Sequence, residues 1–167
     1  GELKSLSQWE IADQPRRLLG DDLILAIYIN ELILRLLPEG DEHIKIFEFY
    51  WTFISNLNKL ASNEKEYALR KFENQLLDDL GYGIDFNFDI DGSAIDKDLK
   101  YNFIEHQGFT SNNEGLFNGK TLLRLSNSDE VITNVNELSI LKKMNRKRLK
   151  SLLGDKPLKS KELFFVN

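Results

Sequence analysis

The sequence predicts a mainly α protein, a helical bundle with a small extended or β-hairpin insertion. Three observations predict it. Apolar residues recur at spacings of three and four through several long stretches. Glycine or proline follows three of those stretches, at Pro38, Gly81 and Gly154, as at the ends of helices. Between residues 84 and 119 the apolar period shortens to two, which indicates extended chain. The 167 residues are 41% hydrophobic and 29% charged with three prolines, a composition typical of one folded domain.

The first helix is expected to begin at Asp21 or Asp22, because either side chain can cap it. It should end at Leu37, before Pro38. Its aliphatic run is interrupted by polar residues and is shorter than the roughly 20 apolar residues that cross a bilayer, so no membrane contact is expected. The chain opens without a basic leader or apolar signal core, so no export signal is predicted, and the lack of cysteine suits the cytoplasm.

The second helix is expected at His43 to Leu60, with many aromatic residues on one face. Asn63 and Glu66 have the spacing of a capping box, in which each side chain accepts a hydrogen bond from the other residue's backbone, and would open a third helix over Glu64 to Leu80. Gly81 is suited to end that helix, because glycine tolerates a left-handed conformation.

Residues 84–90 alternate apolar and polar, which predicts a half-buried strand. A second extended piece is expected at residues 99–104, with a turn at 108–109 and a short helix at 120–125. Asn134 and Glu137 form a second capping-box pattern. It would start a long helix from Val135 to Leu153, ended by Gly154 and Pro157.

We therefore divide the chain into four parts. They are residues 1–14 as the last strand of a preceding domain, 15–83 as the first part of the helical domain, 84–119 as the extended insertion, and 120–167 as the last part of the helical domain.

Charge is unevenly distributed along the chain. Residues 140–167 hold nine basic and two acidic side chains, a net charge of +7, whereas the rest holds 13 basic and 25 acidic ones, a net charge of −12. This asymmetry predicts contact with a polyanion. The residues expected to bind DNA phosphates are Lys142, Lys143, Arg146, Lys147, Arg148, Lys150, Lys156, Lys159 and Lys161.

On a helix, four of these cations fall on a single stripe: Lys143, Arg146, Lys147 and Lys150. The alternative is a solvated face whose cations favour the negative end of the helix dipole. That alternative explains two or three cations near Gly154 but not nine. Phe164 and Phe165 either stack on bases or anchor the end of the chain by packing.

No catalytic constellation is present, so we expect neither an enzyme nor a cofactor. The absence of cysteine excludes disulfides, thiolate metal sites and a cysteine nucleophile. The two histidines, His43 and His106, lie on different segments, and no serine or acid is spaced from them in a way that indicates a catalytic triad. Residues 81–83 lack the lysine of a phosphate-binding loop.

Asn87 to Asp98 partly imitate a calcium loop, but the entering segment alternates like a strand and the last ligand is Asp rather than Glu. Solvated acids on a strand are the better explanation. A metal-dependent hydrolase built on Asp85, Asp89 and Asp91 remains as an alternative.

Several motifs resemble the RecO family of bacterial recombination mediators. The clearest are Ala68 to Gly83, similar to the family's "LRRFE…LL…LGYG", and Leu153 to Phe164, similar to its closing "LGxKPLKSRELF". Tyr28 to Leu32 resembles "YINEL", and Gly1 to Leu6 resembles the last strand of the family's N-terminal OB barrel. The motifs occur in the family order and extend over nearly the whole chain.

The resemblance implies an OB domain, here essentially missing, followed by a helical domain with a zinc ribbon or a zinc-free insertion. Because the chain has no cysteine, it is similar to the zinc-free branch. The resemblance also implies binding to single- and double-stranded DNA, strand annealing, and recombinase loading on gaps coated by single-stranded DNA-binding protein. The implied protein partners are RecR and the acidic, apolar C-terminal tail of that coating protein, in the bacterial cytoplasm at the nucleoid.

Arg35, isolated in an aliphatic helix, is the candidate cation for the carboxylate of that tail. Its alternative roles are to extend to solvent or to pair with Glu31, four residues earlier. The rival to the DNA-binding function is a helical adaptor that uses its basic region to bind acidic proteins only.

Overall fold

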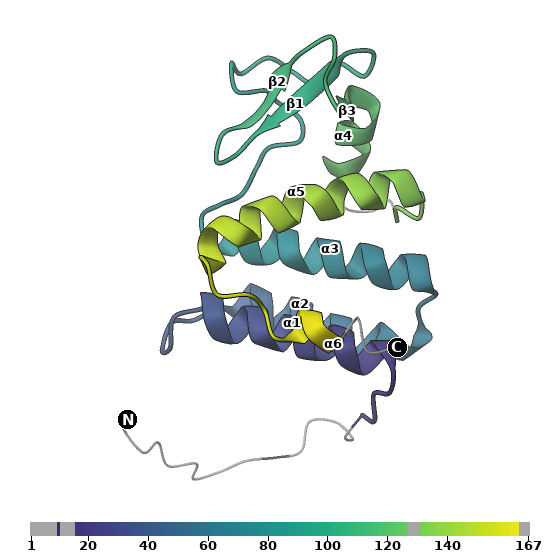
Figure 1. Cartoon of the computed structure of the whole chain (residues 1–167), viewed down its shortest axis with the longest axis vertical. Helices are drawn as coiled ribbons and strands as arrows, with labels where there is room; N and C mark the ends of the chain where they lie inside the picture. Colours follow the sequence, from purple (N-terminus) through teal and green to yellow (C-terminus); the bar gives the residue numbers. More distant parts are fainter. Residues whose placement is uncertain (1–9, 11–15, 127–130, 164–167) are drawn as a thin grey trace.

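The computed structural model describes residue 10 and residues 16–126 and 131–163 (Figure 1). Of the strand remnant expected within residues 1–14, only Glu10 lies inside these ranges, and Phe164 and Phe165 also lie outside them. No helix in the described ranges is long and apolar enough to cross a membrane.

The bundle is formed by four long helices and one short one. These are α1 (Asp21–Leu36), α2 (Ile44–Asn56, continued by the 3₁₀ turn η1, Leu57–Lys59), α3 (Ser62–Asp79), α5 (Val135–Leu153) and α6 (Ser160–Leu163). Figure 1 shows α3 between α5 and the layer of α1, α2 and α6. The expected helical bundle is thus confirmed, and its long helices have bounds within a few residues of those predicted.

The bundle has its own apolar core. Apolar rows of the long helices meet there, because positions three and four apart share one side of a helix. The core residues include Ile29, Leu32, Ile46, Phe53, Leu57, Phe72, Leu76, Leu77, Leu149 and Leu158.

The capping residues predicted for two helices were wrong. Gly20, at φ 55°, precedes α1 and gives no side-chain cap, while Asp22 instead lies 2.5 Å from Lys65 Nζ. At α3, Glu64 rather than Glu66 accepts a hydrogen bond from the Ala61 backbone N–H, at 2.8 Å. Both helices therefore begin near the expected place but with different partners.

The start of α5 was partly predicted. Asn134 Oδ1 accepts hydrogen bonds from the backbone N–H groups of Asn136 and Glu137, at 3.0 and 3.2 Å. The Glu137 carboxylate does not complete the box, because it binds both Thr121 and the Arg124 guanidinium in α4. Gly81 and Gly154 adopt the positive φ expected of glycines that end helices.

The insertion is a three-stranded antiparallel sheet in the order β2-β1-β3, formed by β1 (Lys100–Ile104), β2 (Gly108–Ser111) and β3 (Phe117–Asn118). The short helix α4 (Gly119–Ser126) follows it. Phe103 is paired with Phe109 across the strands, and Tyr101 with Phe117. A second apolar core underlies the sheet, formed by Ile95, Tyr101, Phe109, Phe117, Leu122, Leu141 and Met144.

The strand predicted at residues 84–90 is not formed. The segment forms an isolated bridge between Phe88 and Ala94 and a backbone hydrogen bond from the Ile90 N–H to the Phe109 carbonyl, but no ladder. The Asp85 carboxylate accepts from the Asn87 N–H at 2.7 Å, and the Asp89 carboxylate accepts from the N–H groups of Asp91 and Ser93. Aspartates that bind their own backbone favour turns over a ladder, which explains the failure.

Candidate nucleic-acid interface

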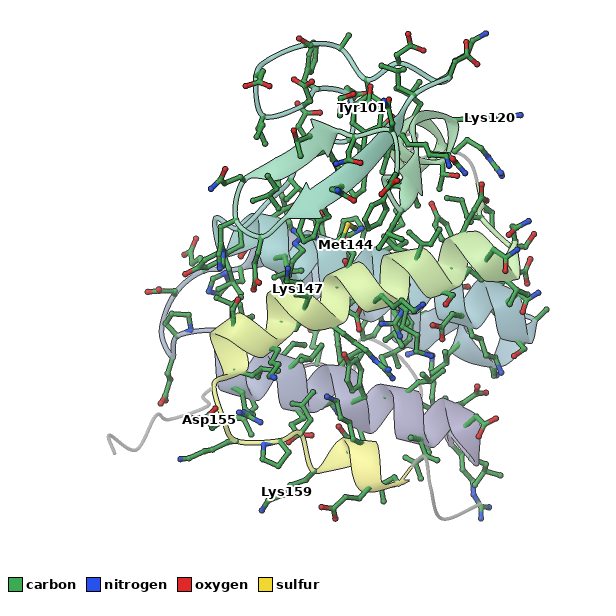
Figure 2. The ribbon with its side chains drawn as sticks, turned by 45° about the horizontal axis from the view of Figure 1, so that its top comes forward. Tyr101, Lys120, Met144, Lys147, Asp155 and Lys159 are labelled. Carbon is green, nitrogen blue, oxygen red and sulfur yellow. The ribbon has the colours of Figure 1, made fainter. Side chains whose placement is uncertain are left out.

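The nine predicted cations lie in three different environments. Arg148 is buried, Lys142 is half-buried, and the other seven are exposed. Lys142 Nζ lies 3.3 Å from a Glu66 carboxylate oxygen in α3. Figure 2 shows Lys159 by α6 and Lys147 on α5, facing the sheet.

Five of these cations line one continuous groove between α1, α3, α5 and the loop leading into α6. The groove consists of two adjoining hollows of about 370 and 360 Å³, and Tyr28, Arg146 and Lys161 line both. We call it the basic groove. Its cations are Lys142, Arg146, Lys150, Lys156 and Lys161, and its apolar walls include Leu25, Leu69, Leu149, Leu153 and Leu158.

Most of the exposed cations have no acidic partner in the described part of the chain. Within that part, no carboxylate lies within ion-pair distance of Lys143, Arg146, Lys150, Lys156, Lys159 or Lys161. Lys147 differs, because its Nζ lies 3.6 Å from a Glu105 oxygen and 6.0 Å from the Phe103 ring centroid. Glu66 and Asp155 also line the groove, but cations outside ion-pair distance of any described carboxylate still leave a positive potential at the surface.

Arg148 does not belong to the exposed set, so its predicted place on a DNA-binding surface was wrong. Only 4% of the residue is exposed. Its guanidinium donates to the Tyr82 carbonyl at 2.6 Å, to Asn74 Oδ1 at 2.9 Å and to Asn145 Oδ1 at 3.4 Å. Burial lowers the pKa of Arg148 to about 10, although Asp78 and Glu73 act in the opposite direction. Arg148 therefore fastens α5 to α3 and to the turn that leads into the insertion.

Arg35 is bound by the chain itself. It donates to the backbone carbonyls of Leu153, Lys156 and Pro157, at 2.9, 2.9 and 3.2 Å, and lies 4.0 Å from Glu31. The predicted pairing with Glu31 is present only at the limit of ion-pair distance. Arg35 thus holds the segment between α5 and α6, and its role toward a partner's carboxylate stays a prediction.

Glu31 fixes the start of α6. Its carboxylate accepts from the Lys159 N–H, the Ser160 N–H and the Ser160 hydroxyl, at 2.8, 2.9 and 2.6 Å. Burial alone would raise the pKa of Glu31. The bonds from Ser160 and Lys159, with the nearby Arg35 charge, outweigh burial and lower that pKa. This carboxylate thereby positions the loop that carries Lys156 and Lys159, and the helix α6 that carries Lys161.

A buried polar network beneath the groove was not foreseen from the sequence. Glu73, fully buried, accepts from the Tyr28 hydroxyl at 2.6 Å, from Arg70 at 2.7 Å and from Asn145 at 3.1 Å. Burial, reinforced by the Glu73 charge, raises the pKa of Tyr28 far above its ordinary value. The network joins α1, α3 and α5, and its Tyr28 lines the groove together with Arg146. A glutamate and an arginine within the apolar row of α3 were its only signal in the sequence.

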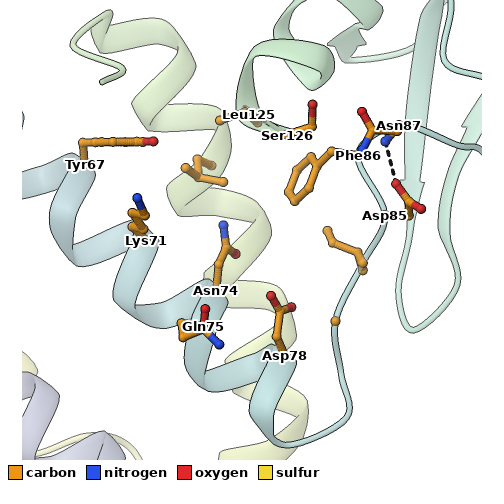
Figure 3. Close-up of a pocket in the computed structure, with 13 residues that line it drawn as sticks. Tyr67, Lys71, Asn74, Gln75, Asp78, Asp85, Phe86, Asn87, Leu125 and Ser126 are labelled. Atoms are coloured by element: carbon orange, nitrogen blue, oxygen red, sulfur yellow. Dashed lines mark hydrogen bonds between the residues drawn. The ribbon is translucent and has the colours of Figure 1, made fainter. Parts of the chain in front are cut away.

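A separate cleft of about 490 Å³ lies between α3, α4 and the start of the insertion (Figure 3). Tyr67, Lys71, Asn74 and Asp78 line it from α3, facing Phe86. Desolvation raises the pKa of Asp78, and the charge of Arg148 partly offsets this effect. No group of metal-ligating side chains occurs in the described ranges, so neither the calcium-like loop nor Asp85, Asp89 and Asp91 assemble a site there.

The histidines also lie apart. His43 Nδ1 lies 2.5 Å from an Asp79 carboxylate oxygen, where it joins the start of α2 to the end of α3. His106 is in the β1–β2 turn with a φ of 64°. Neither is placed with a nucleophile.

Comparison with known proteins identifies the family. The family model for the C-terminal part of recombination protein O matches residues 19–162. Three similar proteins, all named DNA repair protein RecO, come from Pseudoalteromonas translucida, Coxiella burnetii strain RSA 493 and Pseudomonas aeruginosa PAO1. Their sequences are 38%, 37% and 36% identical to this chain, and each alignment covers 98% of it. The chain covers 70%, 71% and 70% of their lengths. This chain therefore belongs to the RecO family, and it corresponds to the family's C-terminal part.

Proposed function

We propose that this chain is the DNA-binding helical part of a recombination mediator that acts in DNA repair. It binds single- and double-stranded DNA through phosphates, promotes annealing, and helps to load recombinase on gaps coated by single-stranded DNA-binding protein. The name shared by the relatives, DNA repair protein RecO, supports the repair role. The proposed setting is the bacterial cytoplasm, at the nucleoid, and we assign no catalytic step to the chain.

The observation that carries the proposal is the grouping of cations around the basic groove. Arg146 and Lys161 come from different helices, 15 positions apart in sequence, yet both line the two hollows. Lys150 and Lys156 extend the positive surface, with Lys159 exposed next to it. Binding of phosphates to such a surface releases counterions and is therefore strongly dependent on salt.

The test is a titration of fluorescently labelled single-stranded DNA at several salt concentrations. The variant carries Arg146→Gln and Lys161→Gln, which remove two charges from the groove. Each lost phosphate contact should reduce the slope of log affinity against log salt by about 0.7. The control is Lys120→Gln, an exposed cation on α4 at the far end of the molecule (Figure 2), which should leave the slope unchanged.

Two outcomes would contradict the proposal. If the unmodified chain shows no salt-dependent binding, the alternative of a helical adaptor that contacts only proteins is favoured. If the groove variant and Lys120→Gln reduce the slope by the same amount per charge removed, binding depends on total charge and not on the groove.

The groove also favours a second ligand, the acidic and apolar tail of single-stranded DNA-binding protein. Phosphates need only cations, but this groove adds apolar walls from Leu25, Leu69 and Leu158. A peptide with apolar side chains and a terminal carboxylate would bury the former and pair the latter with Arg146 or Lys161. The donors of Arg35 bind backbone carbonyls, so we propose Arg146 or Lys161 as the first partner of the carboxylate and keep Arg35 as the alternative.

A labelled tail peptide with a free carboxylate, compared with the same peptide amidated at its C-terminus, tests this placement. Amidation and Arg146→Gln should each weaken binding about tenfold, and together little more than either alone, because both remove the same pair. Additive losses would place the carboxylate elsewhere. RecR is proposed as a further partner on family membership alone, without an assigned surface.

A further inference from the structure

Two aromatic rings meet at the surface between the bundle and the insertion. Tyr82, in the turn after α3, is 42% exposed, and the side chain of His106, in the β1–β2 turn, is 51% exposed. Their ring centroids lie 5.8 Å apart and the rings are tilted by 59°, so neither covers the other as parallel stacked rings do. We call this pair the aromatic platform. It leaves ring surface open to a third flat group.

The backbone holds both rings in place. The Tyr82 N–H donates to the Leu77 carbonyl at 2.8 Å, and the Tyr82 carbonyl accepts from Arg148 at 2.6 Å. Among the residues that the structure describes, only His106 combines a side chain with a positive φ, at 64°. That conformation is uncommon for residues other than glycine, and such outliers occur often at functional sites. A fixed aromatic ring loses little conformational entropy on binding, which suits a contact site.

Cations of α5 lie beside the platform. Lys147 Nζ is 3.6 Å from the carboxylate of Glu105, the residue before His106, and the same carboxylate is 3.8 Å from His106 Nε2. Lys147 therefore offsets the one acid that touches the platform. Lys143 and Lys150 are exposed on α5 about one turn before and after Lys147. A strand whose phosphates contact these lysines passes beside the platform.

We infer that the aromatic platform is a stacking site for a base of single-stranded DNA bound along α5. The inference rests on the proposed DNA binding and adds a contact to the base, which lysines that bind phosphates do not provide. Every base has a π face, so such a site tolerates any sequence. In a duplex the neighbouring base pairs cover these faces, so the platform acts on single strands only.

The test compares two labelled strands of about 15 nucleotides, one of thymidine and one abasic, which keeps the deoxyribose phosphates but has no bases. The affinity of the chain for each strand is measured at several salt concentrations. Tyr82→Leu should weaken binding of the thymidine strand about tenfold at every salt concentration, with an unchanged slope, because stacking releases no counterions. It should not change binding of the abasic strand. Tyr82→Phe, which keeps the ring, should bind both strands like the unmodified chain.

Two further variants complete the design. His106→Asn removes the second ring but tolerates a positive φ, and it should weaken binding of the thymidine strand alone, about fivefold. Phe47→Leu is the matched control, because Phe47 is a 64% exposed aromatic residue on α2, in the layer of the bundle far from the sheet (Figure 1). It should change neither affinity. Thermal unfolding shows whether each variant is folded at the temperature of the assay.

Two results would overturn the inference. If Tyr82→Leu binds the thymidine strand as tightly as the unmodified chain, the ring makes no contact with a base. If it weakens binding of both strands by the same factor, Tyr82 only shapes the surface that binds phosphates. A failure of the proposed function is distinguishable, because the unmodified chain would then show no salt-dependent binding of the abasic strand, and the inference would fail with it.

Discussion

Replacing Arg148 by methionine would remove a buried guanidinium, whereas replacing Lys150 by methionine would remove an exposed cation two residues further along α5. In the first variant, the Tyr82 carbonyl, Asn74 Oδ1 and Asn145 Oδ1 each lose a donor. An unpaired acceptor that is at least partly buried costs about 1–3 kcal/mol, and water can reach some of these, so we expect a total loss of about 3 kcal/mol. Lys150→Met should change the free energy of unfolding by less than about 0.5 kcal/mol.

Urea unfolding followed by circular dichroism gives the two free energies, and thermal unfolding should show a decrease in Tm of about 6–12 °C for Arg148→Met. DNA titrations at several salt concentrations, performed where both variants are folded, give the opposite ranking. Lys150→Met should reduce the slope of log affinity against log salt by about 0.7, and Arg148→Met should leave it unchanged. The reasoning is refuted if Arg148→Met is as stable as the unmodified chain and reduces the salt slope.

Three further predictions concern the framework of the groove and the insertion. Protonation of Glu31 should loosen α6. Because its pKa in the folded chain lies below the ordinary value of 4.5, this contribution to stability is present above that value and is lost as the pH falls through the lower one. Amide exchange at Ser160 should accelerate over that window, but not in Glu31→Gln. Tyr28→Phe removes the 2.6 Å bond to Glu73 and should cost about 1–2 kcal/mol in urea unfolding; a neutral result would mean that water replaces the hydroxyl. Gly119→Ala should cost about 3 kcal/mol or more, because its Cβ would overlap the Asp96 carbonyl oxygen. Gly40→Ala, which has open space around its Cβ and only an unfavourable φ, should cost about 1 kcal/mol.

Local patterns predicted the helices well because their cause is local. Apolar residues three and four apart in residues 64–80 had to share one side of a helix, and α3 has that side buried. The alternation of residues 84–90 is also a local pattern, but it predicted a strand that is not formed. Its polar positions were treated as solvated, but Asp85 and Asp89 bind nearby backbone N–H groups and turn the chain.

The basic groove and the buried network depend on contacts that are distant in sequence. Arg148 reaches Asn74 and Tyr82, which precede it by 74 and 66 residues, and Tyr28 reaches Glu73 across 45. The helical spacing of residues 140–153 did contain one clue, because Arg148 falls beside Leu149 and one turn from Met144, on the buried side. The prediction counted the charges of residues 140–167 without asking on which side of the helix each one lies.

The two apolar cores have a consequence for how such a chain can diverge. Helix α5 contributes Leu149 to the core of the bundle, and Leu141 and Met144 to the core of the insertion. The sheet is stabilised by its own aromatic cluster around Phe109, whose ring centroid lies 5.6 Å from those of Phe86 and Phe103. The insertion can therefore be rebuilt during evolution by altering a short stretch of α5, while the bundle and its cationic surface are inherited unchanged.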